Sequence, residues 1–418
     1  MTHPTPAHGA GCPAVPLSGD RFHTDPLGLY RDMRRDRGPV VPVELPGSIP
    51  AWLVIGYREL HQVASDGELF PRDVSLWNQW GNVPDDWPLL PMVGRPAPSI
   101  YFTAGTEHRR HAAMVGPALE EVDPFELRRH SEELADRLID AFCDRGTADL
   151  VAEFSMLLPV LVLARLVGFP DADGAQIAKV INELADGGPG AQQAQISFAE
   201  HMFKLVAAKH AEPGDDVTSR MIADPAPFTD EEYALDLMAI TAAGHLPTAD
   251  WIGNSIRLML TDDRFAAALS GGRHSVAEAM NEVLWEDAPT QILAGRWAVR
   301  DTTLGGQSVR AGDMLLLGLA AANADPLIRQ DLSPRGSGQS GNSAHLSFGH
   351  GEYRCPFPAQ EIAEILARTG IEVLLDRLPD IDLTVPADAL VRRPSSFLRG
   401  MTSLPVSFTP VRTTGGHL

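Results

Sequence analysis

The sequence predicts a mainly α-helical protein with a small β portion, an α+β fold, and three observations support this. Apolar residues recur at intervals of three and four over residues 107–261, which is typical of amphipathic helices. Within this region, residues 230–260 read as one long helix. Over residues 292–314 the pattern changes to alternation, with a turn at Gly305 and Gly306, which predicts β hairpins.

The chain of 418 residues carries a large acidic surplus. It has 34 Lys and Arg against 55 Asp and Glu, a formal charge of −21. A protein that follows a phosphate backbone needs a basic surface, so we expect no nucleic-acid partner. The most apolar stretch, residues 156–164, is far shorter than the roughly 20 residues that a bilayer span needs, so we expect no membrane association.

The cysteine content indicates the cellular compartment, and the composition of the N-terminus indicates where the folded domain begins. Cys12, Cys143 and Cys355 are too few for a disulfide framework, and no signal segment precedes them, so we expect a cytoplasmic protein. Residues 1–20 are rich in Pro, Gly, His and Thr and read as a mobile tail. We expect residues 21–418 to form a single domain.

The first part of this domain combines a short apolar run with an irregular aromatic segment. The run and the helical pattern after it cover residues 52–63. Residues 73–98 carry Trp77, Trp80, Trp87 and five prolines. A long aromatic loop inside a compact chain is more often a binding lid than a linker, so we expect these tryptophans in or near a substrate pocket.

The long helix has a clear start and an interrupted middle. Thr229 is suited to the N-cap, with Glu232 in the capping-box position three residues later. We expect Gly244 and Pro247 to break the helix. A second capping box, Ser275 with Glu278, predicts a shorter helix over residues 275–286, and residues 333–344 read as a surface loop.

The segment SFGHGEYRCPFP, residues 347–358, is the most informative part of the sequence. Gly349 and Gly351 allow a tight turn and a close approach of backbone to a flat ligand. Pro356 suits the first position of a helix, so Cys355 is expected at a helix N-terminus, where negative charge is favoured. A lone thiolate there is what an axial ligand of haem iron needs. The other interpretation is a turn with a buried structural cysteine.

Other site types are poorly supported. His345 and His350 lie nearby, but no second cysteine stands within metal-ligand spacing, which argues against structural zinc. The segment lacks the third glycine of a dinucleotide fingerprint, and the chain has no phosphate loop. No Gly-x-Ser-x-Gly elbow or His-Glu-x-x-His helix occurs.

The segment resembles the cysteine-ligand loop of cytochromes P450, Phe-Gly-x-Gly-x-His/Arg-x-Cys-x-Gly. Phe348, Gly349, Gly351 and Cys355 match that pattern. The resemblance extends from about residue 20 to residue 410. Further residues fall in the family's order: Glu107 and His108 at the entry of helix C, Ala243 and Gly244 in helix I, Glu282 in helix K, Arg296 on a β-strand, and Asn323, Asp325 and Pro326 after it.

The resemblance implies a cytochrome P450 fold, with haem b (iron protoporphyrin IX) buried between long helix I and the cysteine loop. Cys355 would be the iron ligand, and its thiolate would favour O–O cleavage. It also implies a separate ferredoxin and ferredoxin reductase, and we expect a monomer. The residues expected to hold the cofactor are His108, Arg110, Arg296, Phe348, Gly349, Tyr353 and Cys355, with Arg354 as a further source of charge for the propionates.

Helix I departs from the family pattern at the residues credited with proton delivery. Leu246 stands in place of the acid and Pro247 in place of the alcohol. Thr248 is one residue late and His245 is adjacent, so either is a candidate to organise water for catalysis. The residues expected to line the substrate pocket here are Ala243, Gly244 and Pro247.

Further departures lie around the proximal side. Trp285 replaces the arginine of the helix K motif, so Glu282 must find another donor or a proton. Tyr353 replaces the usual His or Arg, and Ala112 stands where helix C often supplies an Arg. Phe357 replaces Gly, and a ring there is expected to displace the helix or the porphyrin.

These features support two functional hypotheses. In the first, the chain is a P450 monooxygenase that oxidises a bulky small-molecule or peptide natural product in bacterial secondary metabolism, by hydroxylation or by oxidative phenol or peptide coupling. A phenolic substrate would supply its own acidic O–H. The alternative is a haem-binding, P450-like protein that binds a ligand or partner without efficient turnover, suggested by the same departures.

Overall fold

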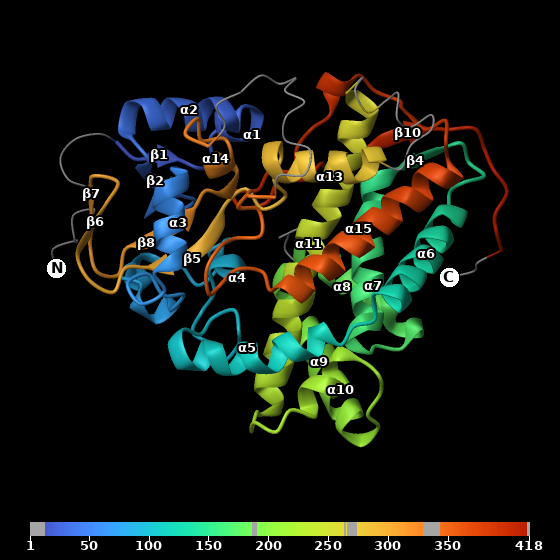
Figure 1. Ribbon diagram of the computed structural model, residues 1–418, viewed down its shortest axis with the longest axis horizontal. Coiled ribbons are helices and arrows are strands. Elements are labelled where there is room, and N and C mark those ends of the chain that lie inside the picture. Colours follow the sequence, from blue (N-terminus) through green and yellow to red (C-terminus); the bar gives the residue numbers. More distant parts are fainter. Residues whose placement is uncertain (1–12, 186–189, 263–264, 266–273, 329–342, 416–418) are drawn as a thin grey trace.

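The computed structural model describes residues 13–185, 190–262, 265, 274–328 and 343–415, and it confirms the predicted fold class (Figure 1). The five-stranded sheet and the N-terminal helices form one side of the molecule, and a helical bundle with β4 (Thr147–Asp149) and β10 (Pro405–Ser407) at its edge forms the other. The helices are α1 Asp20–Thr24, α2 Pro26–Arg37, α3 Tyr57–Ser65, α4 Leu90–Val93, α5 Gly105–Glu120, α6 Pro124–Asp140, α7 Leu158–Val167, α8 Gly174–Ala185, α9 Ala191–Ala211, α10 Val217–Ile222, α11 Asp230–Thr261, α13 His274–Glu286, α14 Leu319–Asn323 and α15 Phe357–Arg377.

The largest sheet has five strands in the order β1-β2-β3-β8-β5. β2 and β3 pair antiparallel, β8 lies parallel to β3, and β5 is antiparallel to β8 with an irregularity before Arg296. A two-residue turn at Gly305 and Gly306 joins β6 to β7, as predicted. The strands are β1 Val15–Pro16, β2 Val40–Leu45, β3 Ile49–Val54, β4 Thr147–Asp149, β5 Leu293–Trp297, β6 Thr302–Leu304, β7 Gln307–Val309, β8 Met314–Leu317, β9 Asp382–Leu383 and β10 Pro405–Ser407.

The expected N-terminal tail is shorter than 20 residues. β1 pairs with β2, and Leu17 is fully buried in the core beside the sheet. The residues before position 13, Cys12 among them, lie outside the described part of the chain, as does most of the loop expected at residues 333–344. The apolar side chain of Leu17 is what brings the chain into the fold this early.

Helix α11 runs through the centre of the molecule and contacts α7, α9, α13 and α15. Its predicted capping box is present: Glu232 N donates to Thr229 Oγ1 at 3.2 Å, and Thr229 N donates to Glu232 Oε2 at 2.7 Å. The predicted break is wrong, because the helix continues through Gly244 and Pro247. Proline removes one backbone donor, and packing of both halves against neighbouring helices outweighs that loss.

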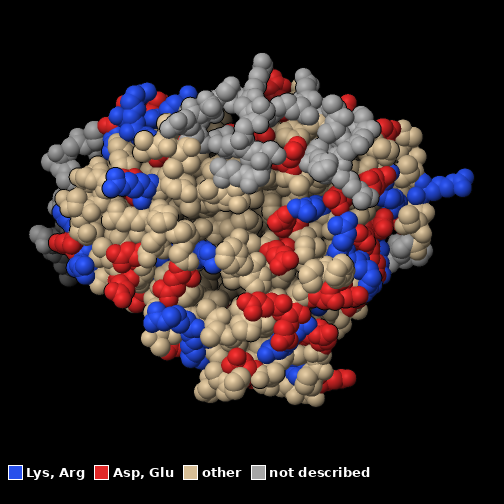
Figure 2. Space-filling view, viewed as in Figure 1, with Lys and Arg blue, Asp and Glu red and all other residues tan. Residues whose placement is uncertain are grey.

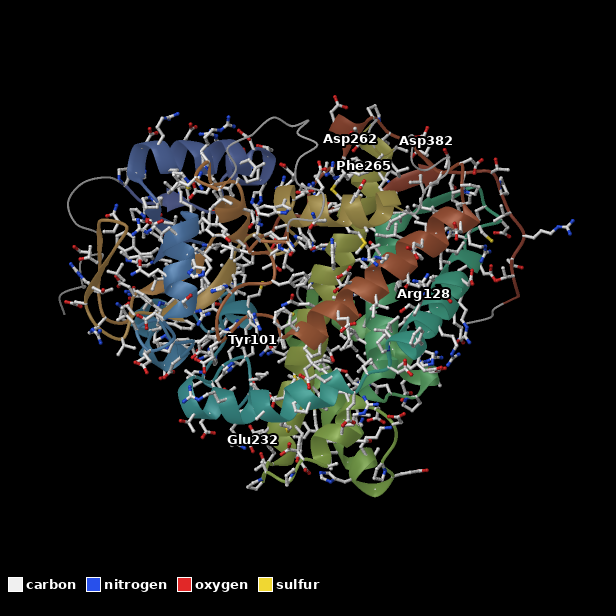
Figure 3. All side chains as sticks on the ribbon, in the orientation of Figure 1. Tyr101, Arg128, Glu232, Asp262, Phe265 and Asp382 are labelled. Atoms are coloured by element: carbon white, nitrogen blue, oxygen red, sulfur yellow. The ribbon has the colours of Figure 1, made fainter. Side chains whose placement is uncertain are left out.

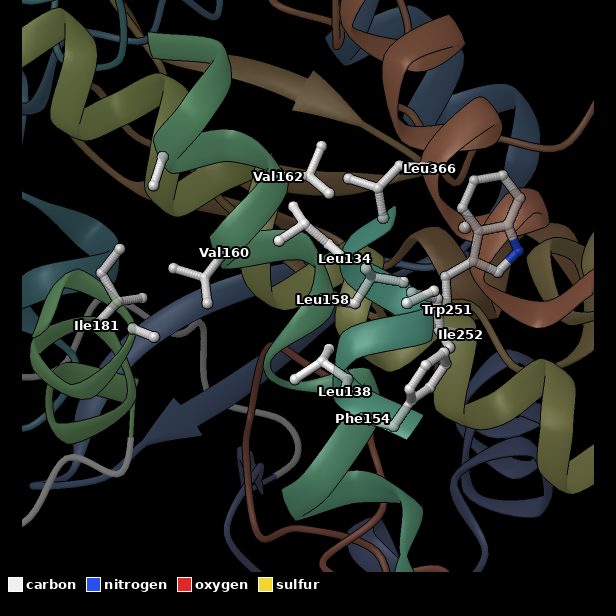
Figure 4. Packing of buried hydrophobic residues seen from close by; sticks show 14 of the residues in the cluster. Leu134, Leu138, Phe154, Leu158, Val160, Val162, Ile181, Trp251, Ile252 and Leu366 are labelled. Carbon is white, nitrogen blue, oxygen red and sulfur yellow. The ribbon is translucent and has the colours of Figure 1, made fainter. Parts of the chain in front are cut away.

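The largest core cluster joins the helices to α11. Figure 4 shows part of it, with Leu134 and Leu138 of α6 facing Phe154 and Leu158, and Trp251 of α11 beside Leu366. Two smaller clusters pack the N-terminal helices and the segment after α3 against the sheet. Among the described helices, none combines the length and apolar character that crossing a bilayer requires.

Charges of both signs intermingle over α6 and α15 on the face shown in Figure 2. Arg377 of α15 pairs with Asp136 and Asp140 of α6 at 2.6 and 2.7 Å, and Arg128 of α6 pairs with Glu372 of α15 at 2.9 Å. These pairs fix the last part of α15 against α6.

Candidate active site

The cysteine loop has the tight geometry that its glycines predicted. Gly349 and Gly351 have φ values of 73° and 76°, a region in which side chains are strained. The backbone N–H of Cys355 donates to the carbonyl of Phe348 at 2.9 Å and closes the loop. A Cβ on Gly351 would lie 2.0 Å from the carbonyl oxygen of Ala64, so α3 packs against the loop backbone.

Cys355 lies directly before α15, as expected. Pro356 is the N-cap of this helix, not its first residue, and Pro358 lies in the first turn. Gln360 Nε2 donates to the carbonyl of Cys355 at 2.6 Å and holds the chain at this point.

Burial dominates the protonation of Cys355. It raises the pKa of the thiol to about 12, so the expected stabilisation of a thiolate by the helix terminus is outweighed in the polypeptide alone. A thiolate at this position requires an adjacent positive charge, and a ferric iron provides one.

Asn323 connects the cysteine loop to the end of α13. Its Nδ2 donates to the carbonyl of Leu284 at 2.9 Å and to Ser347 Oγ at 3.0 Å, and its Oδ1 accepts from Leu346 N at 2.8 Å. Trp285, which stands where the P450 pattern has Arg, packs edge-on against His345 with ring centroids 5.8 Å apart. This contact joins the same two segments through apolar packing.

Two departures from the family pattern on the proximal side concern Glu282 and Phe357. Glu282 is not left without a partner. The ring of Phe357 points outward, is 63% exposed and lies 4.0 Å from the guanidinium of Arg354. The helix therefore begins at Phe357 with this ring exposed, and the expected effect on the porphyrin stays a prediction.

The middle of α11 has one face that the described chain does not cover. Ala242 and Ala243 are exposed and Leu246 and Pro247 are half-exposed, although the helix runs through the centre of the molecule. Exposed side chains on a central helix mean that one of its faces is uncovered by protein. Ala243 and Pro247 lie on this uncovered face, and their contact with a substrate stays a prediction.

The two candidates for proton delivery lie on the opposite face of α11. His245 is fully buried, and its Nε2 donates to the carbonyl of Met156 at 2.9 Å. A Cβ on Gly244 would lie 3.1 Å from Leu163 of α7, and Thr248, one turn further on, is 4% exposed. The buried side of α11, which carries Gly244, His245 and Thr248, therefore faces away from the uncovered side, since each residue turns the helix by about 100°.

We expect His245 to make the fold acid-sensitive. Burial lowers its pKa to about 4, so the unfolded chain binds a proton at this residue first as pH falls below about 6.5. The stability contributed by the neutral ring is therefore lost between about pH 6.5 and pH 4, by about 3 kcal/mol at most. Denaturant unfolding at pH 7 and pH 4 should show a smaller acid loss for His245→Gln than for the wild type. An equal loss would contradict this assignment.

The three tryptophans anchor their segment to the sheet. Trp77 and Trp87 are each 3% exposed, and the ring of Trp77 lies 5.1 Å from that of Trp80 and 5.8 Å from that of Trp87. Trp87 Nε1 donates to the carbonyl of Pro46 at 2.7 Å, and Trp80 Nε1 to that of Val74 at 2.9 Å. They belong to a core cluster beside the sheet, so the expectation that they line a pocket is not met.

A cluster of buried basic and aromatic side chains lies beside the cysteine loop. Arg296 is 2% exposed, and its guanidinium lies 4.2 Å from the ring of Tyr353. Arg72 is 8% exposed and lies 3.5 Å from the ring of Tyr101, which Figure 3 places near the start of α5. His108 packs on Tyr353 with ring centroids 4.5 Å apart.

The charges in this cluster lack acidic partners among the described residues. The guanidinium Nη2 of Arg72 and the hydroxyl of Tyr353 are buried without a hydrogen bond there. Burial, and then the charge of Arg72, lower the pKa of Arg296 to about 9. Buried unpaired cations are unfavourable, so the cluster fits a ligand that brings negative charge.

Arg110 is not part of this cluster. It pairs with Glu232 and, at 3.1 Å, with Glu107. His108 donates from Nδ1 to the carbonyl of Ile100 at 3.0 Å, and burial lowers its pKa, so its role is to connect α5 to the preceding loop.

The residues present fit a haem group. A cysteine before a helix, a glycine turn, an uncovered face of α11 and two buried arginines without an ion pair among the described residues match a flat metal ligand that carries two carboxylates. Sequence reasoning missed Arg72 and Tyr101. The sequence signal for Arg72 is a charged residue next to the apolar pair Phe70 and Pro71, just before the tryptophan-rich segment 73–98.

Comparison with known proteins gives bacterial cytochromes P450. PksS of Bacillus subtilis, a polyketide biosynthesis cytochrome P450, is 28% identical, with 94% of this chain and 98% of the relative covered. Vitamin D(3) 25-hydroxylase of Pseudonocardia autotrophica is 28% identical, with 94% and 96% covered. The monooxygenase PikC of Streptomyces venezuelae is 28% identical, with 95% and 94% covered. No model of a protein family matches the chain.

Solved structures agree with this assignment. The structure of PksS has a TM-score of 0.82 at 28% identity and covers 94% of this chain and 99% of its own. That of CYP154C4 from Streptomyces sp. W2061 has a TM-score of 0.83 at 27% identity, with 94% and 98% covered. The chain therefore belongs to the cytochromes P450, of the actinobacterial type, and is a haem-dependent enzyme of the monooxygenase class.

Proposed function

We propose that the enzyme inserts oxygen into a bulky, largely apolar natural product of bacterial secondary metabolism. The observation that carries this proposal is the uncovered face of α11, made of Ala242, Ala243, Leu246 and Pro247. Small apolar groups there leave room for a large substrate and offer it no ionic contact. Several relatives are named as hydroxylases, which favours hydroxylation.

Haem b, held through Cys355, would supply the activation of dioxygen. The surrounding chain would fix its orientation: the loop from Phe348 to Cys355 supports one face, and Arg296 lies in the buried basic cluster. Cytochromes P450 use redox partners, and we propose a separate ferredoxin and ferredoxin reductase, with the enzyme acting as a monomer.

Proton delivery in this enzyme would not use a side chain of the middle of α11. Neither an acid nor an alcohol stands on its uncovered face, and Thr248 and His245 face α7. Water in the pocket, or a hydroxyl of the substrate, would supply the protons. A phenolic substrate would bring its own acidic O–H. Oxidative phenol or peptide coupling is therefore the second reaction that the uncovered face of α11 allows.

Thr248→Val tests this directly. The substitution keeps the shape of the buried side chain and replaces its hydroxyl with a methyl group. We expect the fraction of consumed NADPH that appears as product to change by less than about twofold, since an effective proton donor contributes about 100-fold or more. A large increase in hydrogen peroxide at the expense of product would show that Thr248 delivers protons after all.

The reaction itself is tested with purified enzyme, ferredoxin, ferredoxin reductase, NADPH and a set of macrolide, steroid and phenolic peptide substrates. Products analysed by mass are expected to gain one oxygen atom. Products that lose two hydrogens without gaining oxygen would establish coupling instead. NADPH consumption with peroxide as the sole product, across all substrates that shift the haem spectrum, would contradict the proposal.

A further inference from the structure

The buried basic cluster contains one arginine that the P450 pattern does not account for. Arg72 lies in the segment after α3, far in sequence from both the cysteine loop and α5. The pattern places basic residues at two positions where this chain has Ala112 and Tyr353. The chain therefore lacks two of the cations expected near the propionates and holds one that is unexpected.

The position of Arg72 is fixed from two sides. Its guanidinium carbon lies 3.5 Å from the centroid of the Tyr101 ring. A Cβ on Gly295 would lie 3.5 Å from its Nε, so the side chain also packs against β5 next to Arg296. Gly295 has a φ of 100°, a conformation suited to glycine, and leaves space for this approach.

Two side chains of the cluster have unused hydrogen-bonding groups. Arg72 is only 8% exposed, and its Nη2 has no hydrogen-bond partner among the described residues. Tyr353 OH, two residues before Cys355 in sequence, is likewise buried without a partner. Among the described residues neither Arg72 nor Arg296 forms an ion pair, and the charge of Arg72 lowers the pKa of Arg296 more than the charge of Glu352 raises it. A dianion would relieve the repulsion between the two arginines.

We propose that Arg72 binds a haem propionate and takes over the role of the basic side chains missing at positions 112 and 353. Its planar guanidinium suits a bidentate contact with a carboxylate. Tyr101 holds the guanidinium in place from the opposite side through a cation–π contact. Arg296 and Arg72, from β5 and the segment after α3, together match the two propionates.

The test is the rate at which the ferric holoenzyme releases haem to excess apomyoglobin. We expect Arg72→Gln to release haem about 10- to 100-fold faster than the wild type, the range for a lost charge-assisted hydrogen bond. Arg72→Lys should fall between the two. Arg95→Gln is the matched control, because Arg95 is exposed and pairs with Asp85 at 2.8 Å; it should release haem at the wild-type rate.

A second arm separates binding of the propionate from packing on Tyr101. Wild type and Arg72→Gln are reconstituted with iron protoporphyrin dimethyl ester, whose propionates carry no charge. Their release rates should then agree within about twofold, because the interaction that the substitution removes is already absent. A penalty that persists with the ester, or a wild-type release rate of Arg72→Gln with natural haem, would overturn the proposal.

The inference remains testable if Arg72→Gln does not fold. The wild type alone should release the ester much faster than natural haem, and Arg72→Lys should narrow that difference. An effect of Arg72→Lys on the affinity of carboxylate-bearing substrates with no effect on haem release would assign Arg72 to the substrate and overturn the proposal. These measurements do not depend on turnover, so they stand apart from the test of the proposed function.

Discussion

Replacing Cys355 by Ser is expected to abolish the strongly red-shifted Soret band of the reduced carbon monoxide complex, together with product formation. The band reports thiolate ligation, and a serine hydroxyl does not supply a comparable donor. In the fold, Cys355 is held by its N–H bond to Phe348 and by Gln360 on its carbonyl, and serine keeps both. The loss should therefore come from the sulfur atom and not from a disordered loop.

Cys143→Ser is the matched control, because Cys143 is the other described cysteine and is fully buried in the helical core. Spectra are recorded after anaerobic reduction and addition of carbon monoxide, with circular dichroism to verify folding. We expect Cys143→Ser to keep the red-shifted band. A Cys355→Ser enzyme that retained the band would place the iron on another ligand and would remove the basis of the site described above.

The sequence predicted best the features that depend on residues close together in the chain. The capping box of Thr229 and Glu232, the turn at Gly305 and Gly306, and the position of Cys355 before a helix were all confirmed. Each rests on local backbone requirements that a few neighbouring residues meet. These features can therefore be predicted without knowing the tertiary contacts of the chain.

Predictions about which way a side chain faces were less successful. Thr248 is one position after the expected alcohol. One position turns a helix by about 100°, which is enough to move a side chain from the uncovered face of α11 to its buried face. Phe357 illustrates the same point, since its ring points to solvent where a clash was expected. Arg72 could not be assigned from sequence, because its meaning depends on Tyr101 and Arg296, which lie 29 and 224 positions further along the chain and meet it only in the fold.

The second prediction with a large effect concerns Asp287, which follows the last residue of α13. Its carboxylate accepts from Arg399 Nε at 2.7 Å, from Arg257 Nη2 at 3.1 Å and from Arg392. The residue is 7% exposed, so all of these contacts are made away from bulk water. Asn254 of α11 adds hydrogen bonds to the backbone carbonyl of Asp287 and to the side chain of Arg392.

This network joins α11, the end of α13 and the segment that contains Arg392 and Arg399. It lies two residues after Trp285, the position at which the P450 pattern has an arginine. Removing the carboxylate would leave three guanidinium groups close together without their shared partner, which is far worse than losing a surface pair. We therefore expect Asp287→Asn to lower the free energy of unfolding by about 3–5 kcal/mol, measured by denaturant titration.

Asp85→Asn is the control, because Asp85 pairs with Arg95 at the surface and its side chain is 98% exposed; its effect should stay below about 1 kcal/mol. The pH dependence gives an independent check. The arginines lower the pKa of Asp287 to about 2, so its contribution is complete above about pH 4 and is lost as pH falls toward 2. Asp287→Asn should lose less stability than the wild type over that interval. Two results would contradict this prediction: an equal loss of stability in acid for the wild type and Asp287→Asn, or a change in the free energy of unfolding as small as that of Asp85→Asn. Either would mean that packing holds the arginines and that the Asp287 carboxylate contributes little.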